Sequence, residues 1–115
     1  MADSKVYIDF SDGVKRVMNN VKLYIKLLGK FKADTNLNDL ETALAAEDLD
    51  KAKVAVHTLK GLAANLSLTE LFNQSLELES QIKAGSPKPE QIETVKTVFA
   101  ATLEEAERVI EENGQ

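Results

Sequence analysis

The stretch from Leu49 to Leu66, LDKAKVAVHTLKGLAANL, carries apolar residues three or four positions apart along its whole length. The residues that keep this spacing are Leu49, Ala52, Val56, Leu59, Ala63 and Leu66. They fall on one stripe of an α-helix, because the helix completes a turn in about 3.6 residues. The stretch therefore predicts a helix with one buried face, and Asp48 is well placed to cap its first turn.

Helical spacing recurs along almost the whole chain, and no segment alternates for long enough to predict a strand. We expect a short first helix, a break at the Asn19-Asn20 pair and a longer helix that ends at Phe31. A turn over residues 35–38 and a shorter helix ending near Glu47 should follow. After the Leu49–Leu66 helix, Ser67-Leu68-Thr69-Glu70 has the form of a capping box, which predicts a helix starting there with Leu68, Leu71, Phe72 and Ile82 buried.

The end of the chain predicts a loop at residues 85–89, GSPKP, and then a last helix. The apolar face of that helix carries Ile92, Val95, Phe99, Leu103, Ala106 and Ile110. Short connections make successive helices run in opposite directions. The sequence therefore predicts an all-α fold, an antiparallel up-down four-helix bundle with an additional short N-terminal helix.

Whole-chain composition narrows the class of protein. A length of 115 residues with 43% hydrophobic and 29% charged residues fits a single domain over 1–115. The absence of cysteine excludes disulfides and thiolate metal sites. A net charge of -5 argues against nucleic acid and membrane surfaces as partners. Without a signal segment or an apolar run of about 18 residues, we expect a cytoplasmic protein and a monomer.

His57 is the chain's only histidine, and it points nearly away from the apolar stripe of its own helix. With a step of about 100° per residue, Lys53, Lys60, Gly61 and Ala64 lie within about 60° of it. Glycine inside a helix costs roughly 0.5 to 1 kcal/mol relative to alanine, so Gly61 needs a reason. Close packing of a neighbouring helix is one explanation. The other explanation is an external partner that docks on Lys53, Gly61 and Ala64. The position of Gly61 away from the apolar stripe favours this second explanation.

These residue types suit a phosphoryl acceptor. Neutral imidazole is a nucleophile near pH 7 and can carry a phosphoryl group on nitrogen. Lys60, one turn after His57, could offset the added negative charge, and Lys53 adds a second cation at longer reach. The sequence has no glycine-rich phosphate cradle and no cluster of metal ligands around His57. We therefore expect a site that receives a phosphoryl group but binds no ATP and no metal of its own.

At VHTLKGLA, residues 56–63, the chain resembles the histidine-containing phosphotransfer (Hpt) domains of bacterial and eukaryotic multistep phosphorelays. The resemblance extends to Tyr24 and Phe31 with leucines between them, to Asp48 before the histidine helix, and to the Leu78-Glu79 pair. The family usually has glycine where Ser67 stands, which leaves the geometry of that turn open. Gln74 occupies a position that is often apolar in the family and receives no role.

The resemblance implies a carrier that takes a phosphoryl group from an aspartate of one receiver domain and passes it to another. The receivers would belong to a hybrid sensor kinase and a response regulator. His57 would be the phospho-accepting residue and Lys60 would stabilise the phosphoryl charge. The carrier would have no kinase activity and no cofactor, since the receiver holds the Mg²⁺.

Two other readings stay open at this point. One is a pseudo-phosphotransfer bundle that only binds a partner, although the presence of both His57 and Lys60 speaks against it. The other is a different enzyme, for which no convergent acid, base or cofactor loop is found. The initiating Met and the full set of helices favour a free-standing protein over an excised domain.

Overall fold

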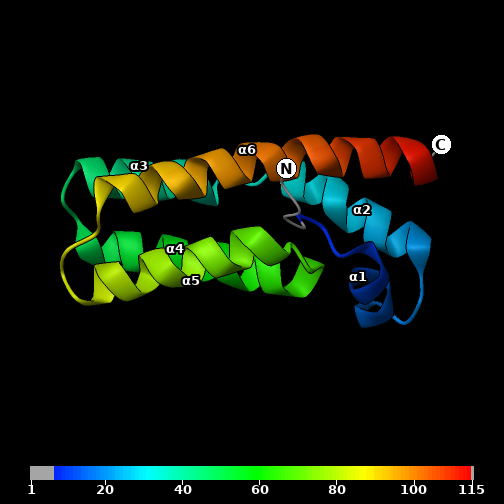
Figure 1. Cartoon of the computed structure of the whole chain (residues 1–115), viewed down its shortest axis with the longest axis horizontal. Helices are drawn as coiled ribbons and strands as arrows, with labels where there is room; N and C mark the ends of the chain where they lie inside the picture. Colours follow the sequence, from blue (N-terminus) through cyan, green and yellow to red (C-terminus); the bar gives the residue numbers. More distant parts are fainter. Residues whose placement is uncertain (1–6, 115) are drawn as a thin grey trace, which may run out of the picture.

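The computed structural model describes residues 7–114, which form six α-helices and no strand (Figure 1). The helices are α1 (Phe10–Arg16), α2 (Val21–Lys32), α3 (Asn36–Ala45), α4 (Leu49–Leu66), α5 (Thr69–Lys83) and α6 (Pro89–Gly114). The predicted break at Asn19-Asn20 is confirmed, because α2 begins at Val21 and the Asn20 side chain accepts from the Leu23 N–H at 3.0 Å.

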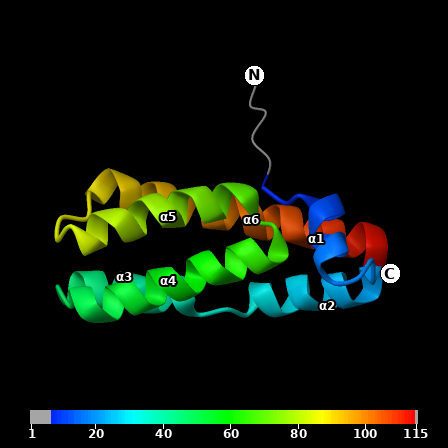
Figure 2. The ribbon, with the colours of Figure 1, turned by 90° about the horizontal axis from the view of Figure 1, so that it is seen from below.

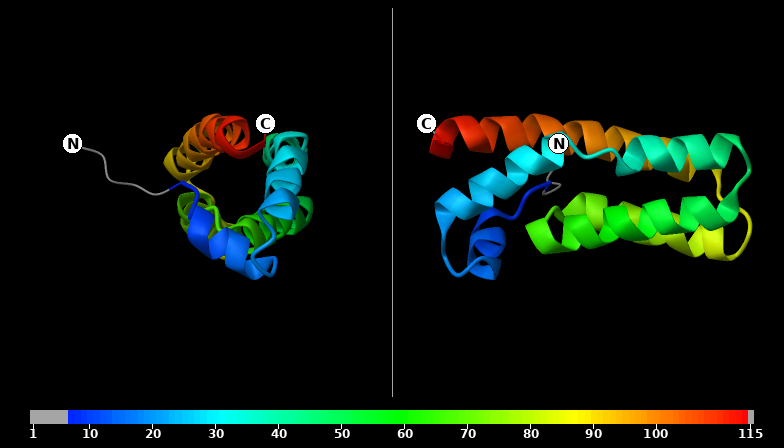
Figure 3. Two further views of the ribbon diagram at one scale, coloured as in Figure 1. Left: turned by 90° about the vertical axis from the view of Figure 1, so that its right-hand side faces the viewer. Right: turned by 180° about the vertical axis from the view of Figure 1, so that it is seen from behind.

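The helices surround a common core as a four-cornered bundle, seen end-on in Figure 3. Helices α4, α5 and α6 each occupy one corner, and α2 and α3 follow one another along the fourth (Figure 2). Successive corners run in opposite directions, and α6 extends along both α3 and α2 (Figure 1). The predicted antiparallel up-down bundle with a short N-terminal helix is therefore confirmed, with one corner divided between two helices.

The core consists of the apolar stripes that the sequence shows. Along α4, Ala52, Val56, Leu59, Ala63 and Leu66 are all buried. Large side chains from the other corners complete it, among them Tyr24, Leu28, Phe31, Leu40, Leu71, Leu78 and Val95. Burial of each large apolar side chain contributes about 1.5–3 kcal/mol, so this stripe fixes the rotation of α4 about its axis. The opposite face of α4, which carries His57, faces solvent.

Four helices end in the same way, with a left-handed residue and a backbone hydrogen bond that spans five residues. At 2.8–3.0 Å, the N–H of Asn19 donates to the carbonyl of Val14, that of Asp48 to Ala43, that of Leu68 to Ala63 and that of Ser86 to Gln81. The left-handed residues include Met18, Asn19, Glu47, Ser67 and Gly85. This closing motif satisfies carbonyls of the last turn and reverses the chain at once, which is why the connections are short.

The predicted capping box at Ser67 is wrong. Helix α5 begins at Thr69 with Leu68 at its N-cap and no side-chain cap, while Ser67 closes α4 with a φ of 57°. In this conformation the Ser67 hydroxyl donates to Asp12 Oδ2 at 2.5 Å, and its carbonyl accepts from the Asp9 N–H at 2.9 Å. Ser67 thus joins α4 to the N-terminal helix, in a backbone conformation that glycine adopts without strain.

Two smaller expectations also need correction. The turn predicted over residues 35–38 is shorter, because α3 begins at Asn36, whose N–H donates to the Asp34 carboxylate at 2.9 Å. Phe72, expected in the core, is only half-buried, whereas Leu68, Leu71 and Ile82 are buried as predicted.

Helix α1 closes the end of the bundle where α4 terminates. The Tyr24 hydroxyl donates to the Leu66 carbonyl at 2.5 Å, and Phe10 packs edge-on against the Tyr24 ring at 5.7 Å. A side chain at Gly13 would collide with that ring, so glycine is required there for close packing. These contacts hold the C-terminal end of the helix that carries His57.

Candidate functional site

His57 lies in the middle of α4. Its side chain is 68% exposed, as the helical-wheel analysis predicts. Helix α4 is held at both ends, at its start by the Asp48 carboxylate, which accepts from the Lys51 N–H at 3.1 Å, and at its end by Tyr24 and Ser67. The imidazole therefore projects from a rigid helix toward solvent.

One edge of the imidazole is anchored by a carboxylate from the neighbouring helix. Nδ1 of His57 lies 2.8 Å from Oε2 of Glu79, which comes from α5. The other oxygen, Oε1, accepts a hydrogen bond from Lys60 Nζ at 2.7 Å. The Glu79 side chain is 4% exposed and that of Lys60 is 21% exposed, so this ion pair is mostly shielded from water.

The surroundings keep Glu79 ionised. Burial by itself raises the pKa of Glu79, but hydrogen bonds from Lys60 and His57 and the charges of Lys60 and Lys83 together lower it below its ordinary value of 4.5. An ionised carboxylate only accepts hydrogen bonds, so Nδ1 of the neutral imidazole must carry the hydrogen. The hydrogen-bond network thus assigns the tautomer in which Nε2 has a free lone pair.

The residues predicted to line a docking surface lie around His57 on α4. Lys53 is exposed one turn before it, and Gly61 and Ala64 are partly exposed after it. A Cβ atom built on Gly61 meets no heavy atom within 4 Å. Close packing inside the bundle therefore does not explain this glycine. Docking of a partner on these three residues stays a prediction.

Glu79 is the site residue whose role the sequence analysis missed, since it noted the residue only as part of a Leu-Glu pair. A signal was present, because Glu79 falls on the buried face of its helix with Ser75, Leu78 and Ile82. A charged residue on an apolar face needs a partner of opposite charge. The preceding antiparallel helix offers Lys60 and His57, so the pairing is detectable from the helical register.

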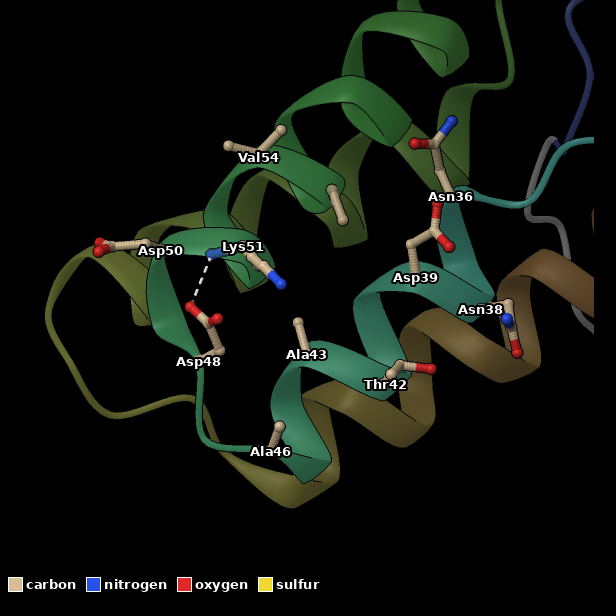
Figure 4. A pocket seen from close by; sticks show the side chains of 11 residues that line it. Asn36, Asn38, Asp39, Thr42, Ala43, Ala46, Asp48, Asp50, Lys51 and Val54 are labelled. Atoms are coloured by element: carbon tan, nitrogen blue, oxygen red, sulfur yellow. Dashed lines mark hydrogen bonds between the residues drawn. The ribbon is translucent and has the colours of Figure 1, made fainter.

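A groove of about 790 Å³ opens elsewhere, between α3 and the first half of α4 (Figure 4). The residues that line it include Ala43, Ala55, Asp39, Asp48 and Val54. His57 does not line it, although Val54 precedes His57 by less than one helical turn. The phosphoryl-acceptor candidate therefore lies outside this groove.

Within residues 7–114, no three His, Cys, Asp or Glu side chains gather closely enough to hold a metal ion. None of the helices there combines the length and the apolar character needed to cross a membrane.

The lowered pKa of Glu79 predicts how the Glu79→Gln variant should behave. Ionised Glu79 stabilises the fold above pH 4.5, and this contribution is lost as the pH falls through the lowered pKa. The difference in unfolding free energy between wild type and Glu79→Gln should therefore shrink as the pH falls below 4.5 and through the lowered pKa of Glu79. Urea titrations at several pH values measure it, with Glu77→Gln on the exposed face of α5 as the control. A difference in unfolding free energy that does not change with pH would contradict the lowered pKa of Glu79.

Comparison with known proteins agrees with this geometry. The family described as Hpt domain matches residues 28–111. No curated protein matches the chain. Among solved structures, the HPT domain from a sensor hybrid histidine kinase of Shewanella has a TM-score of 0.81 at 14% sequence identity, covering 92% of this chain and 95% of that chain. At this identity the likeness shows a shared fold, which is an all-helical bundle. The family match covers most of this chain and shows that the chain belongs to the Hpt domain family.

Proposed function

We propose that the chain is a phosphorelay carrier in which Nε2 of His57 accepts a phosphoryl group from one receiver domain and passes it to another. The observation that carries this proposal is the anchored imidazole, whose Nδ1 is held by a buried carboxylate while the side chain remains 68% exposed. Membership of the Hpt family supports it, because these domains are phosphoryl carriers and generally interact with receiver domains.

The transfer is a displacement at phosphorus. The Nε2 lone pair attacks the phosphoryl group of the receiver's aspartyl phosphate, a P–N bond forms, the P–O bond breaks and the aspartate leaves as a carboxylate. As Nε2 shares its electron pair, positive charge develops on the ring. Glu79 offsets that charge through the hydrogen on Nδ1, which stays in place. In the second step, an aspartate of the next receiver attacks the phosphoryl group, and the electron pair of the P–N bond returns to Nε2.

The phosphoryl group adds negative charge beside the lysines of this surface. Lys60 is the nearest of them to Glu79, and its ammonium has three hydrogens, of which one serves Glu79 Oε1. The others remain available for a phosphoryl group, and Lys53 would add attraction at longer range. The receiver would supply the reactive aspartate and the Mg²⁺ bound by its own acidic residues, so the complete site is composite.

A bundle that only binds partners is the alternative function. Such a protein would need neither a fixed imidazole tautomer nor a buried carboxylate beneath its histidine. The arrangement of His57, Lys60 and Glu79 therefore favours the carrier.

The direct test uses receiver domains from hybrid kinases and response regulators of the source organism, phosphorylated on aspartate with acetyl phosphate. Acetyl phosphate with a labelled phosphoryl group makes the transfer visible. On incubation, the labelled phosphoryl group should move from the receiver to the wild-type chain, and His57→Gln should remain unlabelled. The modification should be lost in acid, because a P–N bond is acid-labile. Label that persists on His57→Gln, or that survives acid treatment, would reject the proposal.

A pair of glycine variants separates folding from docking. Gly61→Leu and Gly29→Leu both replace a helical glycine whose Cβ position is open, in α4 and α2 respectively. Both should keep or raise stability by up to about 1 kcal/mol, because a helix penalty is removed. Only Gly61→Leu should abolish transfer, since its side chain projects about 40° from His57.

Thermal melts and transfer rates on the same samples provide the measurement for both glycine variants. Normal transfer by Gly61→Leu would exclude docking at this position. A large loss of stability confined to Gly61→Leu would show instead that the glycine serves the fold.

A further inference from the structure

Lys83 is a third neighbour of the Glu79 carboxylate, after His57 and Lys60. Its Nζ lies 3.9 Å from Oε2, the same oxygen that His57 contacts at 2.8 Å. This distance is within the range of an ion pair but too long for a hydrogen bond. The Lys83 side chain is 60% exposed and lies one turn after Glu79 on α5, so it is free to move closer. Lys83 is therefore near Glu79 without being fully engaged by it.

Phosphorylation of His57 would make two groups compete for Lys60. In the unmodified protein Lys60 is bound to Glu79 Oε1 at 2.7 Å. A phosphoryl group on Nε2 attracts the same ammonium, because it carries more negative charge than the carboxylate. Glu79 is only 4% exposed, and a buried carboxylate that loses its charged partner is strongly destabilising. Without a replacement, any movement of Lys60 toward the phosphoryl group would leave Glu79 poorly compensated.

We propose that Lys83 is a positioning residue that pairs with Glu79 when Lys60 turns toward the phosphoryl group on His57. The proposal rests on the function proposed above. The geometry favours Lys83 for this role, because a shift of about 1 Å brings its ammonium to the usual distance of a charge-assisted hydrogen bond. Lys83 approaches the carboxylate oxygen next to Nδ1, whereas the phosphoryl group sits on Nε2, across the ring. We therefore expect Lys83 to act through Glu79, and the double variant below tests for direct contact with the phosphoryl group.

The test compares the unmodified and the phosphorylated form of the chain of residues 1–115, so no receiver domain is needed. Phosphoramidate serves as the phosphoryl donor: its P–N bond breaks and ammonia leaves as the new bond to Nε2 forms. The variants are Lys83→Gln, Lys83→Arg, Lys60→Gln and the double variant of Lys60→Gln with Lys83→Gln. Lys22→Gln, an exposed lysine near the start of α2, controls for the change in net charge. Urea unfolding at alkaline pH gives the unfolding constant of each form, and ³¹P NMR confirms that the phosphohistidine survives.

For each protein, the unfolding constant of the phosphorylated form is divided by that of the unmodified form. This ratio should be about two- to fivefold larger for Lys83→Gln than for wild type, which is the size expected for one exposed ion pair. Lys83→Arg and Lys22→Gln should behave like wild type. In the Lys60→Gln background the additional effect of Lys83→Gln should disappear, because no lysine then leaves Glu79.

Three results would overturn the proposal. Equal destabilisation of both forms by Lys83→Gln would show a merely structural ion pair. An undiminished effect in the Lys60→Gln background would show that Lys83 contacts the phosphoryl group directly. Both results leave the carrier function intact, whereas failure of phosphoramidate to modify His57 in wild type would overturn this proposal together with the carrier function.

Discussion

The Glu79 carboxylate lies almost completely buried between α4 and α5, where an isolated charge would be unstable. It remains ionised because each oxygen has its own partner from α4, His57 on one and Lys60 on the other. These two contacts join residues 22 and 19 positions apart in the chain and require one particular register between the two helices. The tautomer of the imidazole, the orientation of its ring and the place of Lys60 all depend on this one group.

The rest of the bundle maintains that register. The apolar stripe of α4 sets which face of the helix is turned outward, and the Asp48 cap fixes where the helix begins. At the other end, the Tyr24 hydroxyl and the Ser67–Asp12 contact attach the end of α4 to the N-terminal helix. These contacts hold the exposed His57 side chain in place on the surface of α4.

Much of this could be predicted from the sequence, because it depends on helical periodicity. The stripe from Leu49 to Leu66 predicts the boundaries of α4 and the outward direction of His57, and the structure agrees with both. The prediction of a capping box at Ser67 was wrong. A local pattern cannot show that Ser67 will adopt a left-handed conformation and donate a hydrogen bond to Asp12, 55 residues away. The role of Glu79 was missed for a similar reason. Its meaning lies in partners on another helix, which become apparent only when the two helices are placed side by side.

The proposed role of Glu79 would decide which nitrogen of the His57 imidazole accepts a phosphoryl group. His57 is the chain's only histidine, so two-bond ¹H–¹⁵N NMR spectra of uniformly labelled protein contain a single imidazole. Before phosphorylation, the spectrum at alkaline pH should show hydrogen on Nδ1 and a free lone pair on Nε2. After phosphorylation, the ³¹P–¹⁵N coupling should appear on Nε2, with Nδ1 still protonated. A coupling on Nδ1, or hydrogen on Nε2 in the unmodified protein, would contradict the assignment of Glu79 as the group that prepares His57 for transfer.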